Sequence, residues 1–463
     1  MGRTDQGEME RSMRPFEAAM EKIAFDPADA GAALAQLPQS AAVFALCFDG
    51  VPTDRSSSVG HGEEAHFEPY VGRTPNLRGR LARLLQPSPK HPRRLQLAGR
   101  VRRIEWRLTG SEFESLLLQF ELLREVYGTK SLERMHLEAP AFVRFLGGNP
   151  YPRIVVTNRP SQREAGWAYG PFQSRAAAER FAEEALKLFL LRRCTDDLDP
   201  NPSHPGCVYS EMKMCLAPCY KGCTDERYAE EAAAVESFLA TRGDSRLVVL
   251  RSERDQASAN LEFESAAAIH AQVQRVEAVR VLAPELVRPL SQLHAVILQP
   301  GANPDEVAVF LFENGRLRGP VAFSTAGMRI QNEQPGASSL LAPPAANEAI
   351  SEVPVPEAPA ADAALPVAGA EAEIAMPAKL ARGLLESRME AALAALAEPN
   401  QAPSPTIRQG HLALLKRWYY RPEVRRTGEI FFPGADDRWP VKALLRGVGR
   451  VAGKMMAAGD HTG

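Results

Sequence analysis

The sequence predicts an α+β protein made of several domains. Three observations support this prediction. Short strands and amphipathic helices alternate through the first third of the chain, four cysteines fall within a 26-residue window near its middle, and an acidic segment without Lys or Arg interrupts its last third. Because the chain has 463 residues, of which 45% are hydrophobic, it can hold two to four domains with ordinary cores.

The formal net charge of -2 conceals a strong segregation of charge along the chain. Residues 73–107 contain eleven Lys or Arg and a single acid, Glu105, so this segment is the expected phosphate-facing surface. Residues 330–377 contain seven acids, no Lys or Arg, and abundant Ala and Pro. Such a composition cannot bury enough apolar surface to fold, and it predicts a disordered acidic linker.

The sequence also bears on the compartment in which the chain works. It contains no apolar stretch of about 18 residues, the length that predicts a membrane-spanning helix. The segment from Met1 to Arg14 is charged throughout and lacks the apolar core of an export signal. We therefore expect a soluble cytoplasmic protein without a membrane partner, whose thiols stay reduced and can bind metal.

The first folded domain is expected at residues 37–130, after an N-terminal extension at 1–36. Ser111 and Glu114 have the spacing of a capping box and precede an apolar run, so they mark the start of a helix whose apolar face belongs to the core. The other expected elements of this domain are strands at 42–47, 67–72 and 100–108 and a helix at 76–85 that carries several arginines.

The remaining segments follow from changes in periodicity and composition. A stripe of Ala266, Ile269, Val273 and Val276 predicts a helix that packs against a partner, and an antiparallel helical hairpin is the simplest arrangement. The expected divisions are a connecting α/β segment at 131–193, a Cys-rich segment at 194–225, the helical hairpin at 226–285, a β segment at 286–329, the linker at 330–377, and a basic C-terminal module at 378–463.

Four cysteines, Cys194, Cys207, Cys215 and Cys219, are candidates to share a metal, and Cys223 follows as a possible fifth. Their uneven intervals lack the paired CxxC pattern of zinc ribbons and are closer to the irregular ligand runs of iron–sulfur proteins. An iron–sulfur cluster of the 4Fe–4S type is the first interpretation. Zinc remains an alternative, as do reduced cysteines with no shared role.

Five stretches of the chain form a series that resembles the UvrC family, the nuclease subunit of bacterial nucleotide excision repair, over roughly residues 37–330. The resemblance includes the second half of the GIY-YIG nuclease signature with its arginine helix, a glutamate helix, a YFGPF-like stretch, a cysteine-rich segment, and the UVR helix pair. In this chain they read Tyr70-Val71-Gly72-Arg73 with Asn76-Leu77-Arg78-Gly79-Arg80, Ser111 to Leu118, Tyr169-Gly170-Pro171-Phe172, Cys215-Leu216-Ala217-Pro218-Cys219, and Leu261 to Ala267.

The resemblance implies a small mixed α/β GIY-YIG nuclease domain and assigns roles to four residues. Glu114 would hold a catalytic Mg2+ or Mn2+, which as a hard cation prefers carboxylate and water. Arg80 would contact the scissile phosphate, and Tyr70 would orient or deprotonate the attacking water. Arg73 stands where the family has lysine, which keeps the charge but changes its geometry.

Two departures from the family pattern bear on activity. The family's Gly-Ile-Tyr reads Ala42-Val43-Phe44 here, so one tyrosine hydroxyl is missing. The loss of a general base can lower a rate by about 10² to 10⁴. Glu121 stands where the family has asparagine and adds negative charge near the phosphate path, where a second carboxylate could join the metal site or repel DNA. A non-catalytic adaptor that binds DNA and UvrB therefore stands beside the nuclease as an alternative.

The resemblance also implies a partner and a limit. The UVR helices would dock on a UvrB-like helicase subunit through the stripe of Ala266, Ile269, Val273 and Val276. The family's RNase H-like nuclease and helix-hairpin-helix pair have no visible counterpart here, which resembles the shorter Cho-type homologues. The expected function is a DNA-repair endonuclease that makes a single incision, on the 3′ side.

In the C-terminal module, Trp418, Tyr419 and Tyr420 lie among basic residues. This combination is typical of single-strand binders or of an ordinary helix with a Trp anchor.

Overall fold

The fold is described from a computed structural model of the chain. The linker predicted at 330–377 and the loop after residue 48 lie outside the described residues. Within the described part, no helix is both long and apolar enough to cross a membrane. The structure describes residues 20–48, 68–86, 97–195, 197–326, 328, 378–397, 403–434 and 436–459.

The nuclease-like domain contains a four-stranded antiparallel sheet in the order β1-β4-β2-β3. Its first strand comes from the segment predicted to be an extension, because β1 pairs with β4 and α1 contacts α2. The prediction that folding begins near Leu37 is therefore wrong by about one strand and one short helix. The elements are β1 Glu21–Ala24, α1 Ala30–Ala35, β2 Ala42–Phe48, β3 Tyr70–Thr74, α2 Leu77–Leu85, β4 Val101–Leu108 and α3 Glu112–Tyr127.

Helices α2 and α3 both begin at sequence-encoded caps. The Asn76 side chain accepts a hydrogen bond from the Gly79 amide at 2.7 Å and caps α2, which begins at Leu77, one residue later than the expected start at 76. Ser111 Oγ accepts from the Glu114 amide at 3.1 Å and caps α3, as predicted. The predicted strands and helices of this domain are otherwise confirmed to within a few residues.

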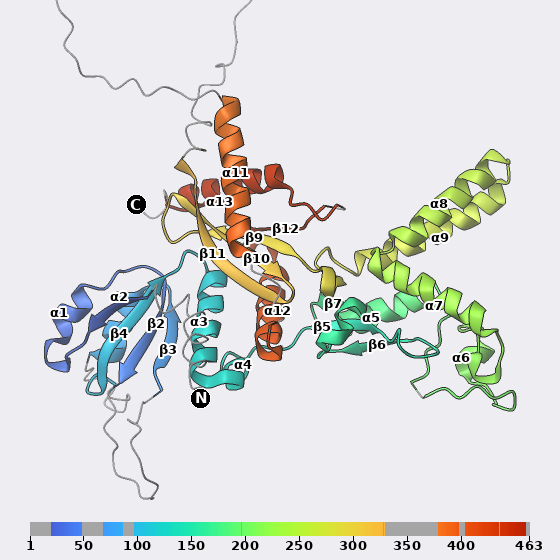
Figure 1. Ribbon diagram of the computed structural model, residues 1–463, viewed down its shortest axis with the longest axis horizontal. Helices are drawn as coiled ribbons and strands as arrows, with labels where there is room; N and C mark the ends of the chain where they lie inside the picture. The colour runs from blue at the N-terminus through green and yellow to red at the C-terminus, as the bar shows by residue number, and fades with distance from the viewer. Residues whose placement is uncertain are drawn as a thin grey trace, which may run out of the picture.

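The middle domain contains a second antiparallel sheet, in the order β6-β5-β7-β8, which packs against α5 and α7. The Cys-rich segment follows α5 and includes the short helix α6. Figure 1 shows this segment on the far side of the middle domain from the nuclease-like domain. The elements are α4 Ser131–Arg134, β5 Ala141–Phe145, β6 Ile154–Thr157, β7 Ala168–Phe172, α5 Arg175–Leu186, α6 Val208–Glu211, α7 Asp225–Ala240 and β8 Arg288–Pro289.

A helical hairpin projects from the middle domain (Figure 1), but it has other bounds than expected. It consists of α8 Asp244–Ala259 and α9 Phe263–Val281, while α7 packs into the domain core. The chain turns at Leu261, whose φ of 63° ends α8 and separates the two helices. The hairpin therefore spans 244–281 rather than 226–285.

The β segment and the C-terminal module form one unit, not two. Strand β12, from the C-terminal module, pairs with β9 and completes a sheet in the order β11-β10-β9-β12. Helices α11 and α13 share a core with this sheet, and α12 joins another core beneath it. The elements are β9 Ala295–Pro300, β10 Glu306–Glu313, β11 Arg316–Ser324, α11 Ala378–Leu396, α12 Pro405–Tyr419, β12 Glu429–Phe431 and α13 Val441–Gly459.

Helix α3 belongs to both the nuclease-like domain and this C-terminal unit. On one side it contacts β2 and β3, and on the other its Phe113 ring packs 5.3 Å from Phe310 and 5.5 Å from Trp418. Two close approaches depend on glycine. Gly410 of α12 lies against the Phe120 ring, and Gly110 lies against the backbone of Gly301. The two halves of the chain are therefore joined through the second face of α3.

Gly410→Ala should destabilise the protein by about 1 to 3 kcal/mol, because the added methyl group would overlap the Phe120 ring. Gly383→Ala in α11 is the matched control. It has open space around the new methyl group, and it should stabilise the fold by about 0.5 to 1 kcal/mol. Urea unfolding of both variants measures the difference. Equal effects from the two substitutions would contradict the docking of α12 on α3.

Candidate functional site

Glu114, the predicted metal ligand, lies buried at the first turn of α3. Only 5% of its surface is exposed, and its Oε2 accepts a hydrogen bond from the Gly110 amide at 2.9 Å. Burial raises the pKa of this carboxyl, against the opposing effects of the Gly110 amide and the Arg107 charge. Glu114 therefore stabilises the turn that precedes α3, whatever other role it has.

A cavity of about 160 Å³ adjoins Glu114 at the junction of the nuclease-like domain and the C-terminal sheet. Glu306 and Arg107 also line it. Mg2+ is commonly held by one or two carboxylates together with water and substrate phosphates, so this pair of carboxylates suits a hard cation. No group of three or more His, Cys, Asp or Glu among the described residues is placed to hold a metal by itself.

Tyr70 and Arg80 belong to the opposite face of the nuclease-like sheet. Tyr70 pairs with Leu46 across the β2–β3 ladder, and directly paired residues share a face. Leu46 packs in the core formed with α2, the helix that carries Arg80. The structure therefore places Tyr70 and Arg80 on the α2 side of the sheet and Glu114 on the α3 side.

Phe44, at the position of the missing tyrosine, is almost fully buried, and its ring lies 6.2 Å from that of Tyr70. The tip of this ring, where a tyrosine would carry its hydroxyl, packs closely beside Gly72. Tyr70 itself is 39% exposed at the end of its strand. The phenol that the family signature requires is therefore present at only one of its two positions.

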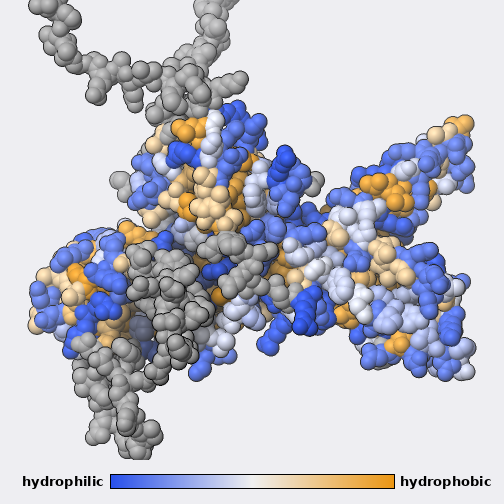
Figure 2. All heavy atoms as spheres, in the orientation of Figure 1, coloured by the Kyte–Doolittle hydropathy of each residue, from blue (hydrophilic) through white to orange (hydrophobic). Residues whose placement is uncertain are grey.

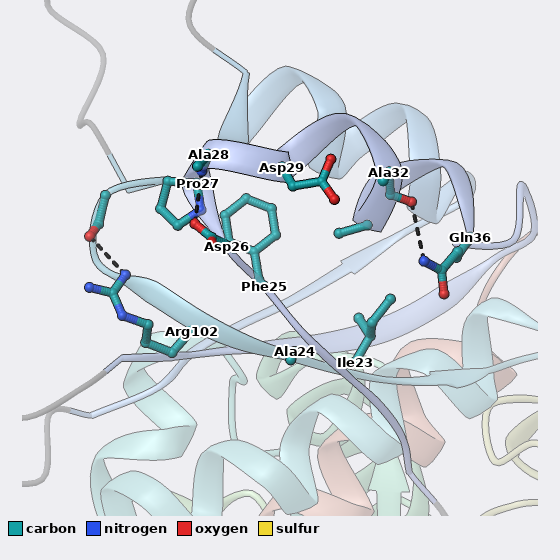
Figure 3. A pocket seen from close by; sticks show the side chains of 12 residues that line it. Ile23, Ala24, Phe25, Asp26, Pro27, Ala28, Asp29, Ala32, Gln36 and Arg102 are labelled. Carbon is teal, nitrogen blue, oxygen red and sulfur yellow. Dashed lines mark hydrogen bonds between the residues drawn. The ribbon is translucent and has the colours of Figure 1, made fainter.

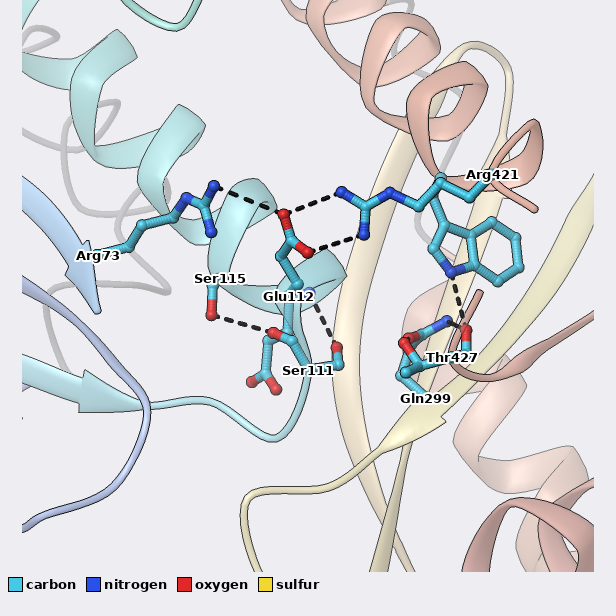
Figure 4. A network of polar contacts seen from close by, with 9 residues as sticks. Arg73, Ser111, Glu112, Ser115, Gln299, Arg421 and Thr427 are labelled. Atoms are coloured by element: carbon cyan, nitrogen blue, oxygen red, sulfur yellow. Dashed lines mark hydrogen bonds and ion pairs between the residues drawn. The ribbon is translucent and has the colours of Figure 1, made fainter. Parts of the chain in front are cut away.

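Arg73 points to α3, where it meets a carboxylate that the sequence did not single out. Figure 4 shows Glu112 between Arg73 and Arg421 of the C-terminal unit. Arg421 donates from Nη1 and Nη2 to the two carboxylate oxygens at 2.8 and 2.9 Å, and Arg73 Nη2 lies 3.5 Å from Oε1. Arg421 is 309 residues from Glu112, and no local sequence pattern links the two residues.

Glu121 also serves the interface. Its Oε1 lies 2.7 Å from His411 Nε2 of α12, and its Oε2 accepts from Arg124 at 2.7 Å. His411 Nδ1 accepts from the Leu317 amide at 2.9 Å, so the ring proton resides on Nε2 and is donated to Glu121. Glu121, which departs from the family's asparagine, thus pairs with a histidine of the C-terminal unit and does not line the face of β3.

The four expected cluster ligands gather in the Cys-rich segment. Burial raises the pKa of the Cys215 and Cys219 thiols, and the charges of Cys194 and Cys207 raise them further. The pKa of the Cys223 thiol is raised by the charge of Cys219 but by none of the other three cysteines, which agrees with its place outside the four expected ligands. All six cysteines are free thiols, and thiolates suit a soft metal or cluster.

The hairpin presents a different apolar surface from the one expected. Val273 and Val276 are buried between α8 and α9, so most of the predicted docking stripe holds the hairpin together. Leu261 and Phe263, at the tip, are 72% and 65% exposed. Figure 2 shows the apolar colour at the end of this projection. The tip is therefore exposed where the stripe is not, and Val248 and Val249 on α8 are exposed as well.

Two further features, the aromatic residues of the C-terminal module and a hollow beside β1, do not contain a group of catalytic residues. Trp418 is buried and donates to the Thr427 carbonyl at 2.9 Å, so the aromatic residues of the C-terminal module anchor a loop and do not form an open stacking surface. A wide hollow of about 840 Å³ lies beside β1 and α1 (Figure 3). Its Asp26 caps a short helical turn, and its Arg102 binds backbone carbonyls.

Glu121→Gln should flatten the acid dependence of stability. Burial raises the pKa of Glu121, but the His411 hydrogen bond and the Arg124 charge outweigh it and bring the pKa to about 2, below the usual 4.5. A depressed folded-state pKa stabilises the fold above pH 4.5, and this stabilisation is lost as the pH falls toward about 2. Gln keeps an acceptor for His411 but does not titrate.

Urea unfolding across this pH range measures the effect, with Glu179→Gln, in an exposed pair with Arg175, as the control. The control should follow the wild-type curve. Parallel curves for wild type and Glu121→Gln would show that Glu121 does not titrate with a depressed pKa.

Two family descriptions match the chain, in the order that the fold displays. Residues 63–127 match the UvrC-like GIY-YIG domain, and residues 142–238 match the middle domain of the UvrC/Cho excinuclease. The first match covers β3 to α3, and the second covers the middle domain from β5 to α7.

Curated relatives agree with these matches. UvrABC system protein C of Alcanivorax borkumensis is 29% identical over 211 residues, which cover 46% of this chain and 34% of the relative. The same protein of Pseudomonas protegens is 30% identical over 46% of this chain and 34% of the relative, and that of Shigella dysenteriae is 30% identical over 45% and 36%. The chain thus spans about a third of the length of these relatives.

No solved structure matches the chain. The resemblance is nevertheless confirmed for the four sequence stretches that lie within the two matched domains, whereas the stretch Leu261 to Ala267 lies outside both. These matches, over two consecutive parts of the chain, support its similarity to the UvrC family.

Proposed function

We propose that this chain acts in nucleotide excision repair in the cytoplasm as a UvrC-type subunit, a DNA endonuclease that makes a single incision on the 3′ side. The observation that carries the proposal is the nuclease-like sheet with α2 and α3 in place, followed directly by the UvrC/Cho middle domain. DNA is the proposed substrate, since the family's relatives are named for the UvrABC system.

In this proposal the residues of the two sheet faces have separate tasks. Arg73, on the same face of the sheet as Glu114, neutralises charge on the scissile phosphate. Arg80 and Tyr70, on the α2 face, contact the DNA backbone away from Glu114, so the water-orienting role that the resemblance implies for Tyr70 does not fit this arrangement. Glu114, with Glu306 beside it, would hold Mg2+ or Mn2+, which supplies charge stabilisation at the scissile phosphate. Because the C-terminal sheet covers Glu114, we expect slow incision unless DNA or a partner loosens that contact.

A second candidate is the non-catalytic adaptor, and the burial of Glu114 favours it. A carboxylate that caps its own helix and is covered by a second domain has a structural task that needs no metal. Phe44 gives the same indication, because it leaves one tyrosine position without a hydroxyl. In both candidates the hairpin tip at Leu261 and Phe263 is the proposed contact with a UvrB-like partner.

Nicking assays distinguish the two candidates. With a lesion-bearing DNA duplex, Mn2+ and a UvrB-like partner, the wild type should nick one strand. Glu114→Gln should lower the rate by about 10² or more while DNA binding remains, because binding depends on the arginines of residues 73–107. Equal inertness of wild type and variant, with DNA binding intact in both, would replace the nuclease by the adaptor.

The purified protein should be brown, with broad absorption near ~400 nm, because we propose an iron–sulfur cluster on Cys194, Cys207, Cys215 and Cys219. Cys215→Ala should remove the colour, whereas Cys47→Ala, in the nuclease-like domain, should keep it. Metal analysis checks the composition. Zinc without iron would support a metal site but contradict the cluster. The absence of both metals would contradict the site as well.

A further inference from the structure

We infer that Arg73, Arg417 and Arg421 form a phosphate-binding surface across the junction of the nuclease-like domain and the C-terminal unit, with Glu112 as the residue that positions them. We call these four residues the junction cluster. The inference rests on the proposed function, since it names where on this chain the backbone of a DNA strand would lie.

The charges of the junction cluster do not balance. Glu112 is a single carboxylate that accepts two hydrogen bonds from Arg421 and lies in an ion pair with Arg73. Arg417 is exposed on α12, one helical turn before Arg421, so three guanidinium groups neighbour one carboxylate. The side chains of Arg73, Glu112 and Arg421 are 35%, 41% and 26% exposed, so the excess positive charge faces solvent. An excess of this sign suits a polyanion.

Arg421 retains donors for a second acceptor. A guanidinium carries five N–H groups in a fixed plane, and Glu112 takes one from each of the two Nη atoms. The same planar arrangement allows a phosphate to be bound bidentately. A partly exposed Arg421 can therefore keep Glu112 on one edge and contact a phosphate oxygen on another.

The loop that carries Arg421 is held in place before any ligand arrives. Trp418 Nε1 donates to the Thr427 carbonyl at 2.9 Å, and Tyr420 Oη donates to the Pro171 carbonyl at 2.9 Å. Figure 4 shows Thr427, the acceptor of the first bond, next to Gln299, whose Oε1 accepts from Thr427 Oγ1 at 3.1 Å. Because these bonds fix the loop, little conformational entropy is lost when Arg421 meets a phosphate.

Arg73 connects the junction cluster to the basic segment at residues 73–107. It is the first residue of the basic segment 73–107, and it lies on the α3 face of β3 beside Glu112. The junction cluster thus extends that segment onto α12 and the loop after it. A purely structural role is the alternative, but exposed Arg–Glu pairs contribute little to stability.

The test uses four variants of the full chain and a fluorescently labelled DNA duplex. Arg421→Gln should weaken binding roughly fivefold and reduce the slope of log affinity against log salt by about one. Glu112→Gln should tighten binding severalfold, because it releases Arg421 and Arg73 from a carboxylate. Arg450→Gln and Glu429→Gln are the matched controls, from another bidentate pair of the C-terminal unit, and neither should change binding appreciably.

Weaker or unchanged binding by Glu112→Gln would overturn the inference, as would equal losses in Arg421→Gln and Arg450→Gln. Should Arg421→Gln fail to fold, Arg417→Gln, at an exposed position of α12, replaces it with the same expected loss. If wild type itself does not bind DNA, the proposed function fails. Wild-type binding that is insensitive to all junction-cluster variants rejects the inference alone.

Discussion

The structure depends on the double use of α3. A helix at the edge of a small domain ordinarily buries one face and leaves the other to solvent. Here the second face is also apolar and packs against β10 and α12 through Phe113, Phe310 and Trp418. Glycines at 110 and 410 let the backbones approach, and the two halves of the chain share one core.

This double use decides what the glutamates of α3 do. Glu112 remains at the open edge and pairs with arginines from both sides, Glu114 turns back to the Gly110 amide under the C-terminal sheet, and Glu121 meets His411. In a free helix all three would be exposed carboxylates with similar properties. Docking of the C-terminal unit makes them different. Glu112 stays partly exposed in an ion pair, burial raises the pKa of Glu114, and the contacts of Glu121 lower its pKa strongly.

Local features of the fold were predictable because their causes are local. The strand expected at 42–47 and the helix start at Ser111 follow from alternation and spacing, and the structure confirms both. Only the Ser111 half of the capping box forms, because Glu114 accepts from the Gly110 amide rather than from that of Ser111. The long-range features were not predictable. The pairing of β12 with β9 joins segments that are more than a hundred residues apart, and short apolar runs do not specify their partners.

The same division holds for the candidate site. Tyr70, Arg73, Arg80 and Glu114 could be named from motifs, but their separation onto two faces of the sheet depends on strand register. Arg421 and His411 could not be found from the nuclease-like segment, because each acts through a contact with a residue roughly 300 positions away. Their only sequence signal was the basic character of the C-terminal module.

The central claim is that the C-terminal unit closes over α3 in solution. Hydrogen exchange at the Leu317 amide tests it most directly, because that amide donates to His411 Nδ1 of α12 and is protected only while α12 is docked. The account predicts that Leu317 exchanges as slowly as neighbouring core amides of β10. Exchange at the rate of an exposed turn, with the β10 amides still protected, would contradict it.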